Sequence, residues 1–184
     1  GGRLVSAGAN ARLGSGNYIV VEADESDASF LNLTPMIAVI TNIDDEHMDH
    51  YGAMARLEDA FVGFANRVPF YGMAVVCKDD PHVAAILPRI NKRVVTYGRS
   101  DGVDYRAVDV RFDGPHTHFQ AIAHGRALGG FTLHMPGAHN VLNCLATIAV
   151  ADELEVPLDV TKQALSTFGG VARRFTVVAQ VKGR

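Results

Sequence analysis

The chain has 184 residues, of which 48% are hydrophobic and 20% charged, and its formal net charge is −3 at pH 7. This composition is typical of a globular domain that buries a core without needing disulfides. The slightly acidic balance, without a Lys/Arg block, argues against nucleic acid as a partner. No apolar run approaches the roughly 18 residues of a membrane span, and no secretory signal is present, so we expect a cytoplasmic protein without membrane partners.

Short apolar runs alternate with helical patterns in the first half of the chain. Four runs predict strands buried on both faces, at residues 17–24, 35–43, 72–77 and 92–98. Residues 54–66 form an amphipathic helical pattern, and Asp80 followed by Pro81 is typical of a helix start. The alternation predicts an α/β fold with a mostly parallel sheet flanked by helices.

The pattern changes near residue 101. Partial alternation at residues 104–112, 116–124 and 127–135, separated by turns at 113–115 and 124–125, predicts a small antiparallel subsheet. Helices are expected at 139–155 and 160–168. Cys77 and Cys144 lie in apolar segments, which favours two buried, reduced thiols over a disulfide.

Two of the predicted strands end in acidic residues. Glu22, Asp24, Glu25 and Asp27 end or follow the first, and Asp44, Asp45, Glu46 and Asp49 follow the second together with His47. No Lys or Arg lies between Glu22 and Asp49. Because ligands bind beyond the carboxyl ends of parallel strands, neighbouring strands would bring these acids to one edge. Their hard oxygens favour Mg²⁺ or Mn²⁺, while the alternative, two solvated loops, remains open.

Two further motifs are candidates for nucleotide binding. In "GAHNVLN", His139 offers a ring for stacking, and Asn140 and Asn143 offer amides that both donate and accept, which suits the edge of a base. A simple capping turn is the alternative. In "GGVARRF", paired arginines that include Arg174 suit phosphate or carboxylate binding, and an exposed basic linker is the alternative.

In their order along the chain, these motifs resemble the central, ATP-binding domain of the Mur ligases, which add amino acids to the UDP-N-acetylmuramic acid precursor of peptidoglycan. The resemblance is carried by "EADESDASFL", "TNIDDEHMDHY", "PFYGMAVVC", "GAHNVLNCLA" and "GGVARRF". It implies ATP-dependent ligation of L-alanine to the carboxylate of UDP-N-acetylmuramate through an acyl phosphate, with Mg²⁺ neutralising phosphate charge. A homodimer is a further expectation.

The resemblance also implies roles for individual residues. Glu22 and His47 match metal ligands, and Arg174 matches an arginine that approaches the γ-phosphate. His139, Asn140 and Asn143 match residues of the adenine site. Glu58 aligns with a lysine that is carbamylated in several sister ligases, so its carboxylate is a candidate for assisting the second metal ion. Asp49 matches a recurrent acid of the loop, and no role is assigned to it.

One motif of the family is absent. The phosphate-binding loop G-x-x-x-x-G-K-[ST] does not occur in this sequence. Because the family carries it upstream of a stretch like "GGRLVSAGANARLGSG", we expect residues 1–175 to be a central domain lacking its start, and 176–184 a linker towards a C-terminal domain. Other interpretations remain: a nucleotide- or metal-binding module without activity, a metal-dependent hydrolase using His47, or a different Mur or folylpolyglutamate-type ligase.

Overall fold

One mixed sheet organises the computed structural model, which describes residues 11, 13–45 and 51–170. Within these residues the strands lie in the order β1 (Ile37–Ile40), β2 (Met73–Cys77), β3 (Val94–Gly98), β4 (Tyr105–Asp113), β5 (His116–Ala123) and β6 (Arg126–Leu133). The first four strands pair in parallel, and β4 to β6 pair antiparallel. The predicted α/β class with a small antiparallel subsheet is therefore confirmed.

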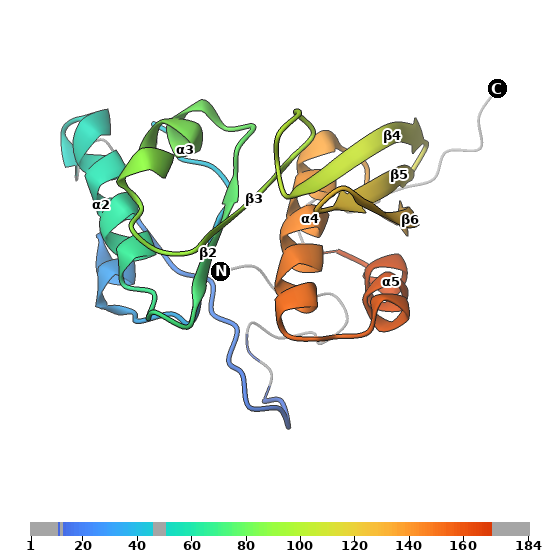
Figure 1. Ribbon diagram of the computed structural model, residues 1–184, viewed down its shortest axis with the longest axis horizontal. Coiled ribbons are helices and arrows are strands. Elements are labelled where there is room, and N and C mark those ends of the chain that lie inside the picture. The colour runs from blue at the N-terminus through green and yellow to red at the C-terminus, as the bar shows by residue number, and fades with distance from the viewer. Residues whose placement is uncertain (1–10, 12, 46–50, 171–184) are drawn as a thin grey trace, which may run out of the picture.

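Helices cover both sides of the parallel strands (Figure 1). They are α2 (Met54–Asn66) and α3 (Pro81–Ile86) on one side and α4 (Ala138–Glu153) on the other, whereas α5 (Leu158–Thr167) packs against β6. Short 3₁₀ turns, η1 (Ser29–Asn32) and η2 (Leu87–Arg89), are also present among the described residues. The α3 helix starts as predicted, because the Asp80 carboxylate accepts a hydrogen bond from the Val83 amide at 2.8 Å and Pro81 follows the cap.

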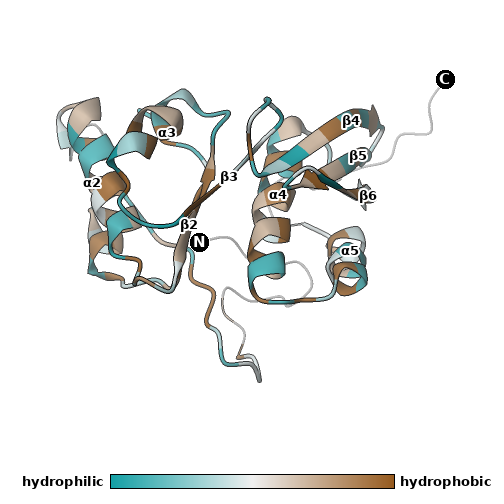
Figure 2. Cartoon of the chain, in the orientation of Figure 1, coloured by the Kyte–Doolittle hydropathy of each residue, from teal (hydrophilic) through white to brown (hydrophobic). Residues whose placement is uncertain are grey.

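Strand β2 separates two hydrophobic cores, and all five of its residues are buried. Met73, Val75 and Cys77 pack into the core shared with α4 and the antiparallel strands. Ala74 and Val76 face the opposite core, which includes α2 and α3. Figure 2 shows the hydrophobic colouring along this strand. Burial on both faces explains why the sequence presents an uninterrupted apolar run here.

Both cysteines are free and buried, as expected. Burial raises the pKa of the Cys144 thiol to about 12 and also raises that of Cys77. At neutral pH both groups therefore remain protonated thiols, which are poor nucleophiles.

The prediction of a strand at residues 17–24 is wrong. The structure has no strand there, and Ile19 and Val20 are 87% and 97% exposed. A strand in a parallel sheet needs backbone partners alongside it, and β1 is the edge strand of the sheet formed by the described residues. An apolar run supplies the side chains of a buried strand but not those partners.

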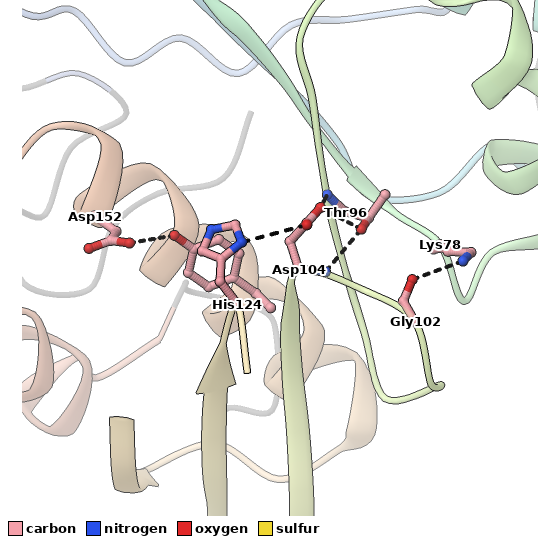
Figure 3. A network of polar contacts seen from close by, with 7 residues as sticks. Lys78, Thr96, Gly102, Asp104, His124 and Asp152 are labelled. Atoms are coloured by element: carbon pink, nitrogen blue, oxygen red, sulfur yellow. Dashed lines mark hydrogen bonds and ion pairs between the residues drawn. The ribbon is translucent and has the colours of Figure 1, made fainter. Parts of the chain in front are cut away.

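A polar network fixes the junction between the parallel and antiparallel parts (Figure 3). The Asp104 carboxylate accepts hydrogen bonds from the Thr96 amide and hydroxyl, both at 2.7 Å, and lies 3.6 Å from His124 Nδ1. The adjacent Tyr105 hydroxyl donates to Asp152 of α4 at 2.5 Å. These contacts tie β3, β4 and the β5–β6 turn to α4, so they help to hold this helix in place against the sheet.

Candidate functional site

The first acidic segment forms a compact turn in front of α2. The carboxylates of Asp24 and Asp27 accept hydrogen bonds from the Ser26 and Ser29 amides, both at 2.9 Å. Phe30, in the 3₁₀ turn that follows, packs against aromatic rings of α2. Asp24 and Asp27 therefore shape the backbone locally. Glu22 precedes this turn and is exposed.

The second acidic segment leaves the carboxyl end of β1. Ile43 is buried, whereas Asp44 and Asp45 are exposed, and the Asp44 carboxylate accepts a hydrogen bond from the Asp45 amide at 2.9 Å. His47 and Asp49, predicted as a metal ligand and an acid of this loop, lie outside the described residues. The local role of Asp44 agrees with an acidic loop in which not every carboxylate binds a cation.

A tyrosine brings the two acidic segments together. Tyr51, four residues after His47, is 6% exposed, and its hydroxyl donates to the Glu25 carbonyl at 2.6 Å. Burial, then the nearby charges of Glu25 and Asp27, raises the pKa of Tyr51. The two acidic segments therefore meet through a loop contact and not through the two neighbouring strands that were expected.

The chemistry of the donors at this place fits a hard divalent cation. Exposed carboxylates such as Glu22, Asp44 and Asp45 offer oxygen ligands, and the sequence between Glu22 and Asp49 contains no Lys or Arg. Within the described part of the chain, no three metal-binding side chains converge on one point. A complete site therefore requires ligands from other residues, from substrate or from water.

Glu58 has a partner that the sequence did not indicate. Its Oε1 lies 2.8 Å from Nδ1 of His82, and this contact joins α2 to α3 across 24 residues of sequence. Both helices begin near the carboxyl ends of the parallel strands, since α2 leads into the start of β2 and α3 follows its end. Glu58 therefore lies on the side of the sheet where the acidic segments meet.

The glycine–histidine–asparagine turn starts α4. Gly137 has φ 107° and ψ 140°, a conformation that a residue with a Cβ rarely adopts. The His139 ring folds back over it, so that a Cβ built on Gly137 would lie 2.7 Å from His139 Cε1. The Asn140 amide donates to the Pro136 carbonyl at 2.7 Å, while Asn143 is exposed. Among the described residues no side chain caps α4 at Gly137, so the turn is fixed by the Asn140–Pro136 hydrogen bond and presents the His139 ring and the Asn143 amide.

This turn lies at the same edge of the sheet as the acids. Arg93, just before β3, forms a 2.7 Å ion pair with Glu153 at the end of α4. The helix therefore runs antiparallel to β3, and its first turn lies towards the carboxyl ends of the strands, at the top of Figure 1. Ligands of parallel α/β sheets bind beyond this edge.

A further loop at this edge escaped the sequence analysis. Asp79, after β2, accepts hydrogen bonds from the amides of Arg99 and Ser100 at 2.6 and 3.1 Å and from the Ser100 hydroxyl at 2.5 Å. Burial alone would raise the pKa of Asp79, but the hydrogen bonds from Ser100 and Arg99 outweigh it and lower the pKa. An acid two residues after a buried strand was the available signal.

Replacing Asp79 by Asn is expected to destabilise the fold by about 1 kcal/mol near neutral pH, a value discounted for the partial exposure of the carboxylate. A carboxylate whose folded pKa is lowered contributes stability above its unfolded pKa and loses it as pH falls through the folded value. The gap between wild type and Asp79→Asn in urea unfolding should therefore close below about pH 4.

The control for this measurement is Asp101→Asn, whose carboxylate is 87% exposed beside Arg106 and should contribute little. A stability gap for Asp79→Asn that stays constant from neutral to acidic pH would contradict the assignment.

Comparison with known proteins decides the family. The model of the Mur ligase middle domain matches residues 7–151. The chain belongs to this family. Arg174, the remaining candidate of the sequence analysis, lies beyond both the matched range and the described residues.

Relatives of this Mur ligase middle domain are similar over its whole length. It is 67% identical over 183 residues to the UDP-N-acetylmuramate–L-alanine ligase of Sorangium cellulosum and 54% identical to that of Myxococcus xanthus, covering 100% of this chain in each case. The chain spans only 39% of the length of either relative. Among the described helices, none combines the length and apolar character needed to cross a membrane.

Solved structures agree on the Mur ligase fold. The UDP-N-acetylmuramate-alanine ligase MurC of Thermotoga maritima has a TM-score of 0.73 at 28% identity, covering 86% of this chain and 35% of the other. MurF of Acinetobacter baumannii reaches a TM-score of 0.74 at 23% identity over 85% of this chain and 34% of the other. The latter likeness concerns the fold alone.

Proposed function

We propose that this chain is the central, ATP-binding domain of a ligase that joins L-alanine to the carboxylate of UDP-N-acetylmuramate. The observation that carries the proposal is the 67% identity across the chain to a relative named for this reaction. In this proposal residues 1–175 belong to the central domain and 176–184 lead towards a C-terminal domain. The phosphate-binding loop and the UDP-binding domain are supplied by the rest of a longer protein, as the greater length of the relatives suggests.

Each candidate residue then has a chemical task. Glu22 and His47 would hold Mg²⁺, for which Mn²⁺ is a plausible substitute because it accepts the same ligands. His139, Asn140 and Asn143 would line the adenine site, and Arg174 would approach the γ-phosphate. When bound, Mg²⁺ supplies positive charge next to the phosphate oxygens. The acidic segments that meet through Tyr51, at the edge where α4 also begins, support this division of tasks.

The reaction proceeds in two transfers. A carboxylate oxygen of UDP-N-acetylmuramate attacks the γ-phosphorus of ATP, the bond to the β-phosphate oxygen breaks, and ADP leaves. The uncharged amine of L-alanine then attacks the acyl carbon and displaces phosphate, losing a proton as the amide forms. Catalysis in such transfers is mostly positioning and charge stabilisation, which agrees with a site built from carboxylates, an imidazole and an arginine.

A second copy of the chain is the proposed protein partner. Phe70 and Tyr71, in the turn before β2, are 92% and 65% exposed, and their rings pack edge-to-face with centroids 5.2 Å apart. Exposed aromatic pairs of this kind are typical of interfaces. We expect the full-length protein to form a homodimer in the cytoplasm. Analytical ultracentrifugation that finds a monomer at micromolar concentration would overturn the dimer.

The function is tested by phosphate release from ATP by the full-length protein. Release should require UDP-N-acetylmuramate, L-alanine and Mg²⁺ together, and the amide product should form in equal amount. Residues 1–184 alone should form no amide, since they lack the phosphate-binding loop. Release that ignores the amino acid would favour a hydrolase, and binding of ATP without any turnover by the full-length protein would favour an inactive binding module.

A further inference from the structure

We infer that His82 is a positioning residue, which holds the Glu58 carboxylate in place at the edge where the metal ions of the proposed reaction bind. This inference rests on the proposed function. It starts from one contact, the 2.8 Å approach of His82 Nδ1 to Glu58 Oε1. The family resemblance gives a candidate role to Glu58 and none to His82.

The position of the pair in the fold favours a role at the site. Glu58 is the fifth residue of α2, which follows the loop that contains His47. His82 is the second residue of α3, directly after the turn that leaves β2. Both residues therefore lie in the N-terminal halves of helices that begin near the carboxyl ends of the strands, where ligands of parallel α/β sheets bind.

Burial makes the contact more than a passing surface pair. The side chains of Glu58 and His82 are 21% and 39% exposed, so water screens their interaction only in part. Nδ1 donates when it carries the proton, which leaves the carboxylate anionic. Within the described residues the second oxygen of Glu58 has no hydrogen-bond partner, so it remains available to a cation.

The two helices do not need this pair in order to dock. Arg89, in η2 directly after α3, forms an ion pair with Asp59, the neighbour of Glu58. Asn66 of α2 accepts from the Asn91 amide at 2.7 Å and donates to the Arg89 carbonyl at 3.1 Å. Buried apolar side chains of both helices share one core. α2 and α3 therefore stay packed together without His82. The Glu58–His82 contact has a different role.

That role is to orient the flexible side chain of Glu58, whose carboxylate would bind the metal ion. Glutamate has three rotatable side-chain bonds, and a metal site must restrict them before the carboxylate binds well. A hydrogen bond from an imidazole to one oxygen fixes the carboxylate and leaves the other oxygen directed elsewhere. Partners of this kind typically change metal affinity by about 10-fold to 100-fold when they are removed.

The test measures Mn²⁺ affinity by electron paramagnetic resonance in the full-length protein, with a non-hydrolysable ATP analogue bound. His82→Ala should weaken Mn²⁺ binding about 10-fold or more. His82→Asn places an amide nitrogen near the position of Nδ1 and should restore most of the affinity. Arg89→Ala removes the neighbouring ion pair between η2 and α2 and serves as the matched control, with unchanged Mn²⁺ affinity.

The outcomes separate positioning from helix attachment. Equal losses of affinity in His82→Ala and Arg89→Ala, or no loss in His82→Ala, would overturn the inference, as would a failure of His82→Asn to recover affinity. Amide formation by the wild type is measured separately. If no amide forms while the pattern of Mn²⁺ affinities holds, the proposed function fails and the role of His82 stands.

Discussion

Replacing Glu22 by glutamine is expected to lower kcat of the full-length protein about 100-fold to 1,000-fold, the range seen when one stabilising group is removed from a developing charge. Glutamine keeps the size of the side chain but loses the negative charge that would bind Mg²⁺ between the phosphates. The loss should be partly recovered at high Mg²⁺ concentration, because weaker binding is compensated by mass action. Steady-state kinetics across a Mg²⁺ series measures both effects.

The same acidic segment provides the control for Glu22. Asp27 lies five residues further on, and its carboxylate accepts the Ser29 amide at 2.9 Å as part of a local turn. Asp27→Asn should therefore leave the Mg²⁺ dependence unchanged. If Glu22→Gln stays within about threefold of wild type, or if Asp27→Asn shows the same Mg²⁺ dependence, then Glu22 is not the metal ligand of this account.

Replacing Gly137 by alanine is expected to destabilise the fold by about 1–3 kcal/mol and to weaken binding of an ATP analogue by about 10-fold or more. The backbone at Gly137 has φ 107°, and an added Cβ would lie 2.7 Å from His139 Cε1. Relief of this clash moves either the His139 ring or the start of α4. The candidates for the adenine site, His139, Asn140 and Asn143, all lie there.

Urea unfolding and calorimetric titration with the analogue measure these two effects. Gly16→Ala is the control, because a Cβ at Gly16 meets no atom within 4 Å. A Gly137→Ala variant with wild-type stability would show that the turn tolerates a side chain. A destabilised Gly137→Ala variant that binds the ATP analogue with wild-type affinity would instead show that the turn does not contribute to nucleotide binding.

Local patterns predicted most of the fold correctly. The bounds of α2 agree with the amphipathic pattern at 54–66, and Asp80 with Pro81 marked the start of α3. These signals act within a few residues and therefore appear in the sequence. The prediction of a strand at residues 17–24 was wrong because a strand depends on partner strands that are distant in the chain. An apolar run does not reveal whether those partners are present.

The site was predictable to a smaller extent. The sequence predicted that two neighbouring strands would bring the acids together, whereas the structure joins the two acidic segments through the Tyr51–Glu25 contact, which spans 26 residues and involves a backbone carbonyl. The pair formed by Glu58 and His82 likewise depends on how two helices pack. Composition marks which residues are able to bind a ligand, whereas long-range packing decides which of them meet.

The central claim, ligation through an acyl phosphate, is tested most directly by following a carboxylate oxygen atom of UDP-N-acetylmuramate through the reaction. UDP-N-acetylmuramate labelled with ¹⁸O in its carboxylate is converted by the full-length protein with ATP, Mg²⁺ and L-alanine, and the released phosphate is analysed by mass spectrometry. An acyl-phosphate intermediate transfers a carboxylate oxygen to phosphorus, so the account predicts ¹⁸O in inorganic phosphate. Amide formation with unlabelled phosphate, or with the label in AMP, would contradict it.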